Sequence, residues 1–89
     1  MIQDTLKALS DPTRRKILEL LKSGPKTAGE IGEQFQMTGA TISHHLSILK
    51  KAELVQDEKK GTYIFYEINT SVMEDLLSWV VNFIGEKDE

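Results

Sequence analysis

Two short amphipathic helices joined by a very short connection are predicted between residues 27 and 51, and this arrangement constrains the fold more than any other feature. The first helix begins at Thr27, because Thr27 and Glu30 have the spacing of a capping box. Ile31 and Phe35 follow at helical spacing and place apolar side chains on one face. This helix is the first half of a candidate helix-turn-helix.

The second helix of the pair is predicted to begin at Thr38, directly after the Gln36-Met37 connection, and to run to about Lys51. Three apolar residues recur at helical spacing and would form its buried face: Ile42, Leu46 and Leu49. Small and polar residues occupy its other side: Gly39, Ala40, Ser43, His44 and Ser47. In a helix-turn-helix the second helix lies in the major groove of DNA, and its first residues meet base edges. The pattern therefore predicts that this helix reads DNA.

Two further helices are predicted before this pair. The first has apolar residues at helical spacing, namely Ile2, Leu6 and Leu9. The second can be capped by Ser10 or Asp11 and has Pro12 in its first turn, where proline is tolerated. Its apolar face is made of Ile17, Leu18, Leu20 and Leu21, and it ends at Ser23-Gly24-Pro25.

A β-hairpin is predicted after the pair. Its strands are Leu54–Glu58 and Thr62–Ile68, and Lys59-Lys60-Gly61 joins them. Gly61 supplies the positive φ that a tight turn needs.

One more helix ends the pattern. It starts near Thr70 or Ser71, since Ser71 and Glu74 have capping-box spacing, and Gly85 ends it. The predicted fold class is mainly α with a β-hairpin, a winged helix-turn-helix of order α-α-α-α-β-β-α that forms a homodimer. We expect one domain over residues 1–89, with the helix-turn-helix at about 27–51, the wing at about 54–68, and a dimerisation helix at about 70–85 that packs with residues 2–9.

The net charge of −3 argues at first against a nucleic-acid partner. The distribution of the charge removes this objection. Residues 1–61 carry ten Lys or Arg and eight Asp or Glu, which gives a net charge of +2. Residues 62–89 carry one Lys and six Asp or Glu, which gives −5. No acidic residue occurs from Gln34 to Ala52, a stretch that includes Lys50 and Lys51. A DNA-binding surface needs a local field rather than a basic isoelectric point.

Several classes of function are excluded by what the sequence lacks. There is no cysteine, so disulfides, thiolate metal sites and thiol redox sensing are excluded. No apolar run is long enough to span a membrane, and Met1-Ile2-Gln3-Asp4 leads directly into an amphipathic pattern rather than a signal peptide. We find no phosphate loop and no nucleophile paired with a base. We therefore expect a cytoplasmic protein that is not an enzyme, with no cofactor and no small-molecule substrate.

The residues predicted to contact double-stranded DNA fall in three groups. Hydroxyl and imidazole groups can bond base edges or phosphates, small residues let the helix approach closely, and basic groups meet phosphates. The first group is on the reading helix: Thr38, Gly39, Ala40, Thr41, Ser43, His44 and Ser47. The second group is on the wing: Lys59, Lys60 and Thr62. The third group, Arg14 and Arg15, is at the start of the helix that follows Asp11. The alternative is that these polar residues face only water.

The neighbouring residues His44 and His45 invite a metal interpretation. Adjacent positions on a helix point about 100° apart, so the two rings cannot readily bind one ion from one face. We predict no metal site, and we expect His45 to pack or to form a hydrogen bond between helices.

The last helix carries more apolar residues than one stripe, and one stripe suffices to pack a helix on its own domain. The surplus predicts a second buried face against a twofold partner. The residues predicted at this interface are Ile2, Leu6, Leu9, Val72, Met73, Leu76, Trp79, Val80 and Phe83. The alternative is a thick monomer core, for which a chain of 89 residues has little interior. A twofold dimer would place two reading helices about one turn of DNA apart.

Three segments resemble the ArsR/SmtB family of bacterial repressors: Ala8 to Leu18, Thr41 to Leu49, and Ala52 to Val55 followed by Lys60-Gly61 and Tyr66. The Ser-His-His-Leu form and the apolar last helix are most similar to the SdpR-type autorepressor branch. The resemblance covers nearly the whole chain. It implies a homodimer that binds an inverted-repeat operator and represses transcription, including that of its own gene.

The sequence departs from the family in its metal sites. The family's thiolate sites need cysteines, and its site on the last helix uses histidines with carboxylates, whereas this helix offers only Glu74 and Asp75. Carboxylates alone would hold Zn²⁺ poorly. We predict a metal-independent repressor, and the SdpR-type resemblance favours release by a sequestering antagonist such as a membrane protein. The alternatives are a metal-responsive repressor with an unrecognised oxygen and nitrogen site, and a winged helix that binds protein instead of DNA.

Overall fold

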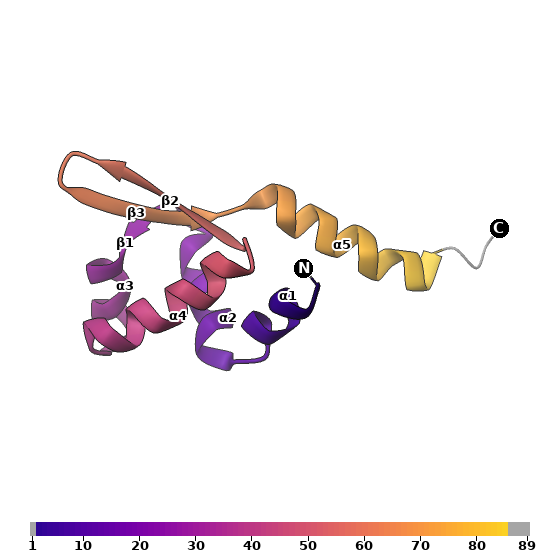
Figure 1. The fold of residues 1–89 in the computed structure, drawn as a ribbon, viewed down its shortest axis with the longest axis horizontal. Coiled ribbons are helices and arrows are strands. Elements are labelled where there is room, and N and C mark those ends of the chain that lie inside the picture. Colours follow the sequence, from indigo (N-terminus) through magenta and orange to yellow (C-terminus); the bar gives the residue numbers. More distant parts are fainter. Residues whose placement is uncertain (1, 86–89) are drawn as a thin grey trace.

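The computed structural model describes residues 2–85, which form five helices and a three-stranded sheet (Figure 1). The elements in chain order are α1 (Ile2–Leu9), α2 (Pro12–Leu21), β1 (Lys26–Thr27), α3 (Ala28–Phe35), α4 (Gly39–Lys51), β2 (Val55–Lys60), β3 (Tyr63–Ile68) and α5 (Thr70–Gly85). The predicted fold class, mainly helical with an antiparallel hairpin, is confirmed. The hairpin projects past α3 and α4 at one end of the molecule, and α5 extends away at the other end.

The core lies between α4 and the elements that surround it. Its buried residues come from every element except β1, β3 and α5, and they include the predicted face of α4, where Ile42, Leu46 and Leu49 are at most 2% exposed. Ile31 of α3 and Leu54 before β2 are fully buried against the same cluster. Burying a side chain of this size stabilises a fold by roughly 1.5–3 kcal/mol, so α4 is held firmly from its inner side.

Local capping signals were largely predicted correctly. Asp11, not Ser10, caps α2, because its carboxylate accepts from the Arg14 amide at 3.1 Å. The Thr27 capping box on α3 is complete, with both reciprocal hydrogen bonds present. Thr38 caps α4 by accepting from the Thr41 amide.

The predicted capping box at Ser71 is wrong. Asn69 precedes α5 and caps it instead, since its side-chain oxygen accepts from the Val72 amide at 3.4 Å and its carbonyl accepts from the Met73 amide at 3.2 Å. Asparagine is as good an N-cap as serine, so the two competing local signals could not be ranked from the sequence.

The predicted turn of the hairpin is shifted. β2 continues through Lys60, which pairs with Tyr63, so the turn consists of Gly61 and Thr62 rather than residues 59–61. Gly61 has the predicted positive φ, at 65°. Lys59 and Lys60 therefore belong to a strand, in which successive side chains point to opposite faces.

A short strand before α3 was not predicted. β1 pairs with β3, with Lys26 opposite Tyr66 and Thr27 opposite Phe65. Two residues are too few to show an alternating pattern, and the pairing depends on a partner almost forty residues away. This strand ties the start of α3 to the base of the wing.

Candidate nucleic-acid interface

The two helices of the helix-turn-helix approach each other closely at one glycine. A Cβ atom on Gly32 of α3 would lie 3.4 Å from the Met37 carbonyl oxygen and 3.6 Å from the Ile42 side chain, at van der Waals contact distance. Gln36 ends α3 in the left-handed region, with φ of 55°, and turns the chain toward α4. The close approach fixes α4 on α3 and leaves its other side to solvent.

The outer side of α4 carries the residues that the sequence predicted for DNA contact. All seven are exposed: Thr38, Gly39, Ala40, Thr41, Ser43, His44 and Ser47. No side chain on this face is longer than imidazole, so the helix backbone could come near a base pair. The amide groups at the start of α4 also favour a phosphate.

Hydrogen bonds divide these side chains into two groups. The Thr38 hydroxyl donates to the Thr41 hydroxyl at 3.0 Å while it caps the helix, and the Ser47 hydroxyl donates to the His44 carbonyl at 2.8 Å. Within residues 2–85, the Ser43 hydroxyl has no such partner, and the His44 ring has only a tilted contact with the His45 ring. Ser43 and His44 therefore present exposed polar groups that no hydrogen bond within residues 2–85 occupies.

The predicted phosphate contact of Arg14 is wrong. Arg14 is 8% exposed, and its guanidinium donates to the Ala8 carbonyl at 2.8 Å and to the Lys7 carbonyl at 3.0 Å. These bonds hold the end of α1 against α2. Arg15 is exposed and donates to the Leu9 carbonyl at 2.6 Å, so it remains a candidate for phosphate.

His45 has the inter-helix role that the sequence predicted. Its Nδ1 atom lies 3.3 Å from a terminal nitrogen of Arg14 and 4.0 Å from the carboxylate of Asp11. Only 12% of its side chain is exposed. The same carboxylate caps α2, and the hydrogen bond that it accepts from the Arg14 amide, together with the positive charge of Arg14, holds the pKa of Asp11 below its usual value.

An ion pair links the reading helix to the wing. Lys50 near the end of α4 donates to the Asp57 carboxylate in β2 at 2.9 Å. This hydrogen bond and the charge of Asp57 raise the pKa of Lys50. Lys50 is thus paired with the wing and is not a free cation for DNA.

The two wing lysines have different surroundings. Lys59 is on the same face of the hairpin as Asp57, the face that Lys50 approaches, because the two residues are two positions apart on one strand. Lys60 is on the opposite face, with its ammonium 6.0 Å from the centre of the Phe65 ring. Thr62 is exposed in the turn, and Tyr63 beside it is 63% exposed. Tyr63 was not among the residues predicted at the wing, and its exposure makes it a further candidate for contact there.

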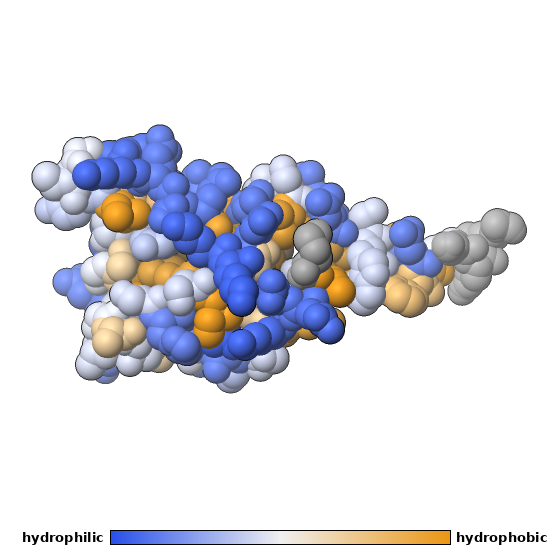
Figure 2. Space-filling view, in the orientation of Figure 1, coloured by the Kyte–Doolittle hydropathy of each residue, from blue (hydrophilic) through white to orange (hydrophobic). Residues whose placement is uncertain are grey.

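The last helix is exposed along most of its length. Only its beginning packs on the core of its own chain, through Val72 and Met73, as Leu9 of α1 also does. From residue 77 onward six large apolar side chains are 41–72% exposed: Leu77, Trp79, Val80, Val81, Phe83 and Ile84. Apolar colour appears on the far part of α5 in Figure 2. Three of these residues, Leu77, Val81 and Ile84, were not among the predicted interface residues and widen that apolar surface.

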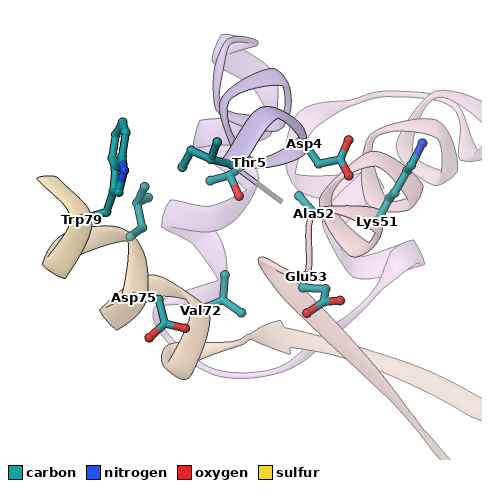
Figure 3. Close-up of a pocket in the computed structure, with 10 residues that line it drawn as sticks. Asp4, Thr5, Lys51, Ala52, Glu53, Val72, Asp75 and Trp79 are labelled. Carbon is teal, nitrogen blue, oxygen red and sulfur yellow. The ribbon is translucent and has the colours of Figure 1, made fainter.

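A hollow of about 300 Å³ lies where α1, the end of α4 and α5 meet (Figure 3). Its apolar walls include Ile2, Val72, Leu76 and Trp79, all of which were predicted at the dimer interface. Leu6 of α1 is 51% exposed. Four of the predicted interface residues, Ile2 of α1 and Val72, Leu76 and Trp79 of α5, are thus brought together at this hollow.

No metal-binding group is evident in the described part of the chain, where no cluster of three or more His, Asp or Glu side chains could hold an ion. Glu74 and Asp75 are both exposed on α5. Among the described helices, none has the length and apolar character needed to cross a membrane.

The α3–α4 pair, its exposed polar helix face and the adjoining hairpin define a winged helix-turn-helix DNA-binding regulator. Comparison with known proteins makes the class specific. The chain belongs to the family described as "Bacterial regulatory protein, arsR family", whose profile matches residues 11–57. This is a family of DNA-binding transcriptional regulators and repressors, not of enzymes.

Individual relatives agree with this assignment. The transcriptional repressor SdpR of Bacillus subtilis is 52% identical over 98% of this chain and 97% of its own length. The arsenical resistance operon repressor of Staphylococcus aureus is 39% identical over 81% of this chain and 69% of its own. Among solved structures, the homodimeric winged helix-turn-helix DNA-binding domain of a possible ArsR-family regulator from Mycobacterium bovis is 28% identical, with a TM-score of 0.75 over 99% of this chain and 83% of that one.

Replacing Ser43 and His44 together by alanine should abolish specific DNA binding and leave the fold intact. Both side chains are exposed, and each bidentate or well-placed base contact is worth about 1–3 kcal/mol of discrimination. Fluorescence anisotropy with the duplex from upstream of the gene, against a scrambled duplex, measures the loss. Thr13→Ala at the start of α2 is the control. Retention of sequence preference by the double variant would exclude these residues as base contacts.

Proposed function

We propose that this protein represses transcription as a homodimer that places α4 of each copy in the major groove of an inverted-repeat operator. The observation that carries this proposal is the division of α4, whose inner edge is buried and whose short polar side chains face solvent around Ser43 and His44. The wing then extends beyond α4, where Lys59, Lys60 and Thr62 can meet phosphate or minor groove. We take residues 1–89 as one winged-helix unit, acting in the cytoplasm where its DNA target lies.

The dimer is supported by the exposed apolar side chains of α5. A helix that packs on its own chain only through Val72 and Met73 would leave large side chains such as Trp79 and Phe83 in water. A second copy related by a twofold axis can cover them, together with Leu6 of α1 and the hollow between α1 and α5. The similar domain from Mycobacterium bovis is described as homodimeric.

The twofold axis also gives the geometry that an operator requires. A pair of symmetry-related α4 helices can enter successive major grooves about 34 Å apart on one face of DNA. We therefore expect an inverted repeat with half-sites about one helical turn apart, and we propose that one such operator precedes the protein's own gene.

Release from DNA is proposed to be independent of metal. The chain has no cysteine, and α5 offers Glu74 and Asp75 without a histidine, which is a poor donor set for Zn²⁺. A sequestering protein is the release mechanism that we favour, and a membrane protein is one candidate for it.

Operator affinity should fall steeply with salt, with a contribution from the wing. Each phosphate neutralised by the protein contributes about −0.9 to the slope of log K against log salt. We expect Lys59→Ala, on the face of the wing that Lys50 approaches, to reduce the slope by about one such unit. Lys60→Ala, on the opposite face, is measured in the same way and shows whether that lysine also neutralises a phosphate.

The measurement is a fluorescence titration of labelled upstream duplex at several salt concentrations. Weak association without salt dependence or sequence preference would instead support a winged helix that binds protein. Equal slopes for wild type and the Lys59 variant would remove this lysine from the interface.

Phe83→Glu should convert the dimer to a monomer. Phe83 is 72% exposed within its own chain, so the substitution leaves the monomer core untouched but places an unpaired charge in the proposed interface, at a cost of several kcal/mol. Asn82→Glu adds the same charge on the polar side of the same helix and is the control. Sedimentation velocity measures the oligomeric state, and circular dichroism checks the fold. A folded Phe83→Glu dimer would place the interface elsewhere.

Removing or adding metal should leave operator affinity unchanged within about twofold, because no described cluster can hold an ion. The titration is repeated with EDTA and with Zn²⁺ or Ni²⁺ in slight excess over protein. A drop of tenfold or more in one metal would show an oxygen and nitrogen site that the sequence did not reveal.

A further inference from the structure

A largely buried polar cluster joins three helices, α1, α2 and α4. Arg14 of α2 is at its centre and uses three of its nitrogen atoms, which contact the Ala8 carbonyl, the Lys7 carbonyl and the His45 ring. Arg14 is 8% exposed, so this guanidinium has been removed from water and its bonds replace hydration. One side chain thereby connects α1, α2 and α4.

The contacts to α1 are made at the end of that helix. The last carbonyl groups of a helix have no partner within it, and a positive charge is favourable there. Arg14 bonds two of these carbonyls, and Arg15 bonds a third, that of Leu9, at 2.6 Å. The end of α1 is therefore fixed by two consecutive residues of α2.

The contact to α4 defines the state of His45. Arginine has only donors, so Nδ1 of His45 must be the acceptor, and a neutral ring in this contact carries its proton on Nε2. The charged or titratable groups that the structure places against this ring are the Arg14 guanidinium, the Asp11 carboxylate 4.0 Å from Nδ1, and the His44 ring on α4 itself, with centroids 6.0 Å apart. A proton on Nδ1 would remove the acceptor for Arg14 and place a second positive charge beside the guanidinium, and it would leave the ring paired with the Asp11 carboxylate instead.

We propose that Arg14 and His45 are positioning residues that hold the reading helix α4 at a fixed angle to α1. This inference rests on the proposed function, in which α1 belongs to the dimer face and α4 reads DNA. The Arg14–His45 contact then links the two faces: it sets how far apart and at what angle the dimer presents its two reading helices. His45 itself does not touch DNA, and protonation of its ring loosens the link and weakens operator binding.

Two substitutions of His45 separate positioning from simple packing. Asparagine keeps an acceptor oxygen near the position of Nδ1 but cannot take up a proton, whereas leucine has similar bulk and no acceptor. At about pH 8 we expect wild type and His45→Asn to bind the upstream duplex within about threefold of each other, and His45→Leu to bind about tenfold more weakly because a buried donor of Arg14 loses its partner. Sedimentation and thermal unfolding confirm that each variant is a folded dimer.

The pH profile supplies the second measurement. Between about pH 8 and about pH 5.5, where imidazole changes charge, wild type should lose affinity relative to His45→Asn. His44 is present in both proteins, so its own titration cancels in the comparison. Equal acid responses of wild type and His45→Asn would overturn the proposal, as would full operator affinity of His45→Leu.

Failure of this inference is distinguishable from failure of the proposed function. If wild type at about pH 8 shows no sequence preference, the DNA-reading role itself is wrong. The link can then still be examined by nitrogen NMR of His45, which should show the neutral ring protonated on Nε2 and bonded through Nδ1. The opposite tautomer would overturn the link whatever the DNA result.

Discussion

The structure depends on α4, because this one helix forms both the centre of the core and the surface proposed to read DNA. Ile42, Leu46 and Leu49 are at most 2% exposed on its inner edge, and Ser43 and His44 are exposed on the outer one. The surrounding elements pack on the inner edge, so the outer edge is held in place by the same burial that stabilises the fold. A reading surface built on a rigid helix is more accurate than one built on a loop, since its backbone does not have to be ordered when DNA binds.

The two proposed binding activities lie at opposite ends of the molecule. The wing and the start of α4 are at one end, and the exposed apolar part of α5 is at the other (Figure 1). The charge is uneven along the sequence, with +2 over residues 1–61 and −5 over residues 62–89, and no acidic residue occurs from Gln34 to Ala52, the stretch that contains α4. An acidic chain can therefore present a field suited to phosphate at one end and an apolar surface for a second copy at the other. The cluster around Arg14 lies between these two ends and connects α1 with α4.

Much of the fold was predictable because its signals are local. Asp11, Thr27 and Thr38 cap the helices that follow them, and Gly61 has the positive φ of a tight turn. Each of these preferences depends on a few consecutive residues, as does the helical spacing of Ile42, Leu46 and Leu49. The errors arose where two local signals compete, as for Asn69 and Ser71 before α5, or where too few residues are involved, as in β1.

The sequence by itself determined the order of the elements, the inner and outer edges of α4 and the apolar excess of α5, since periodicity and capping are properties of neighbouring residues. Only the tertiary structure decided which of two adjacent arginines is buried: Arg14 bonds carbonyls of α1, while Arg15 stays exposed. It also placed Lys59 and Lys60 on opposite faces of the wing and paired Lys50 with Asp57. Such distinctions depend on which distant groups meet, because a side chain's partner is set by the packing of whole elements and not by its neighbours in the chain.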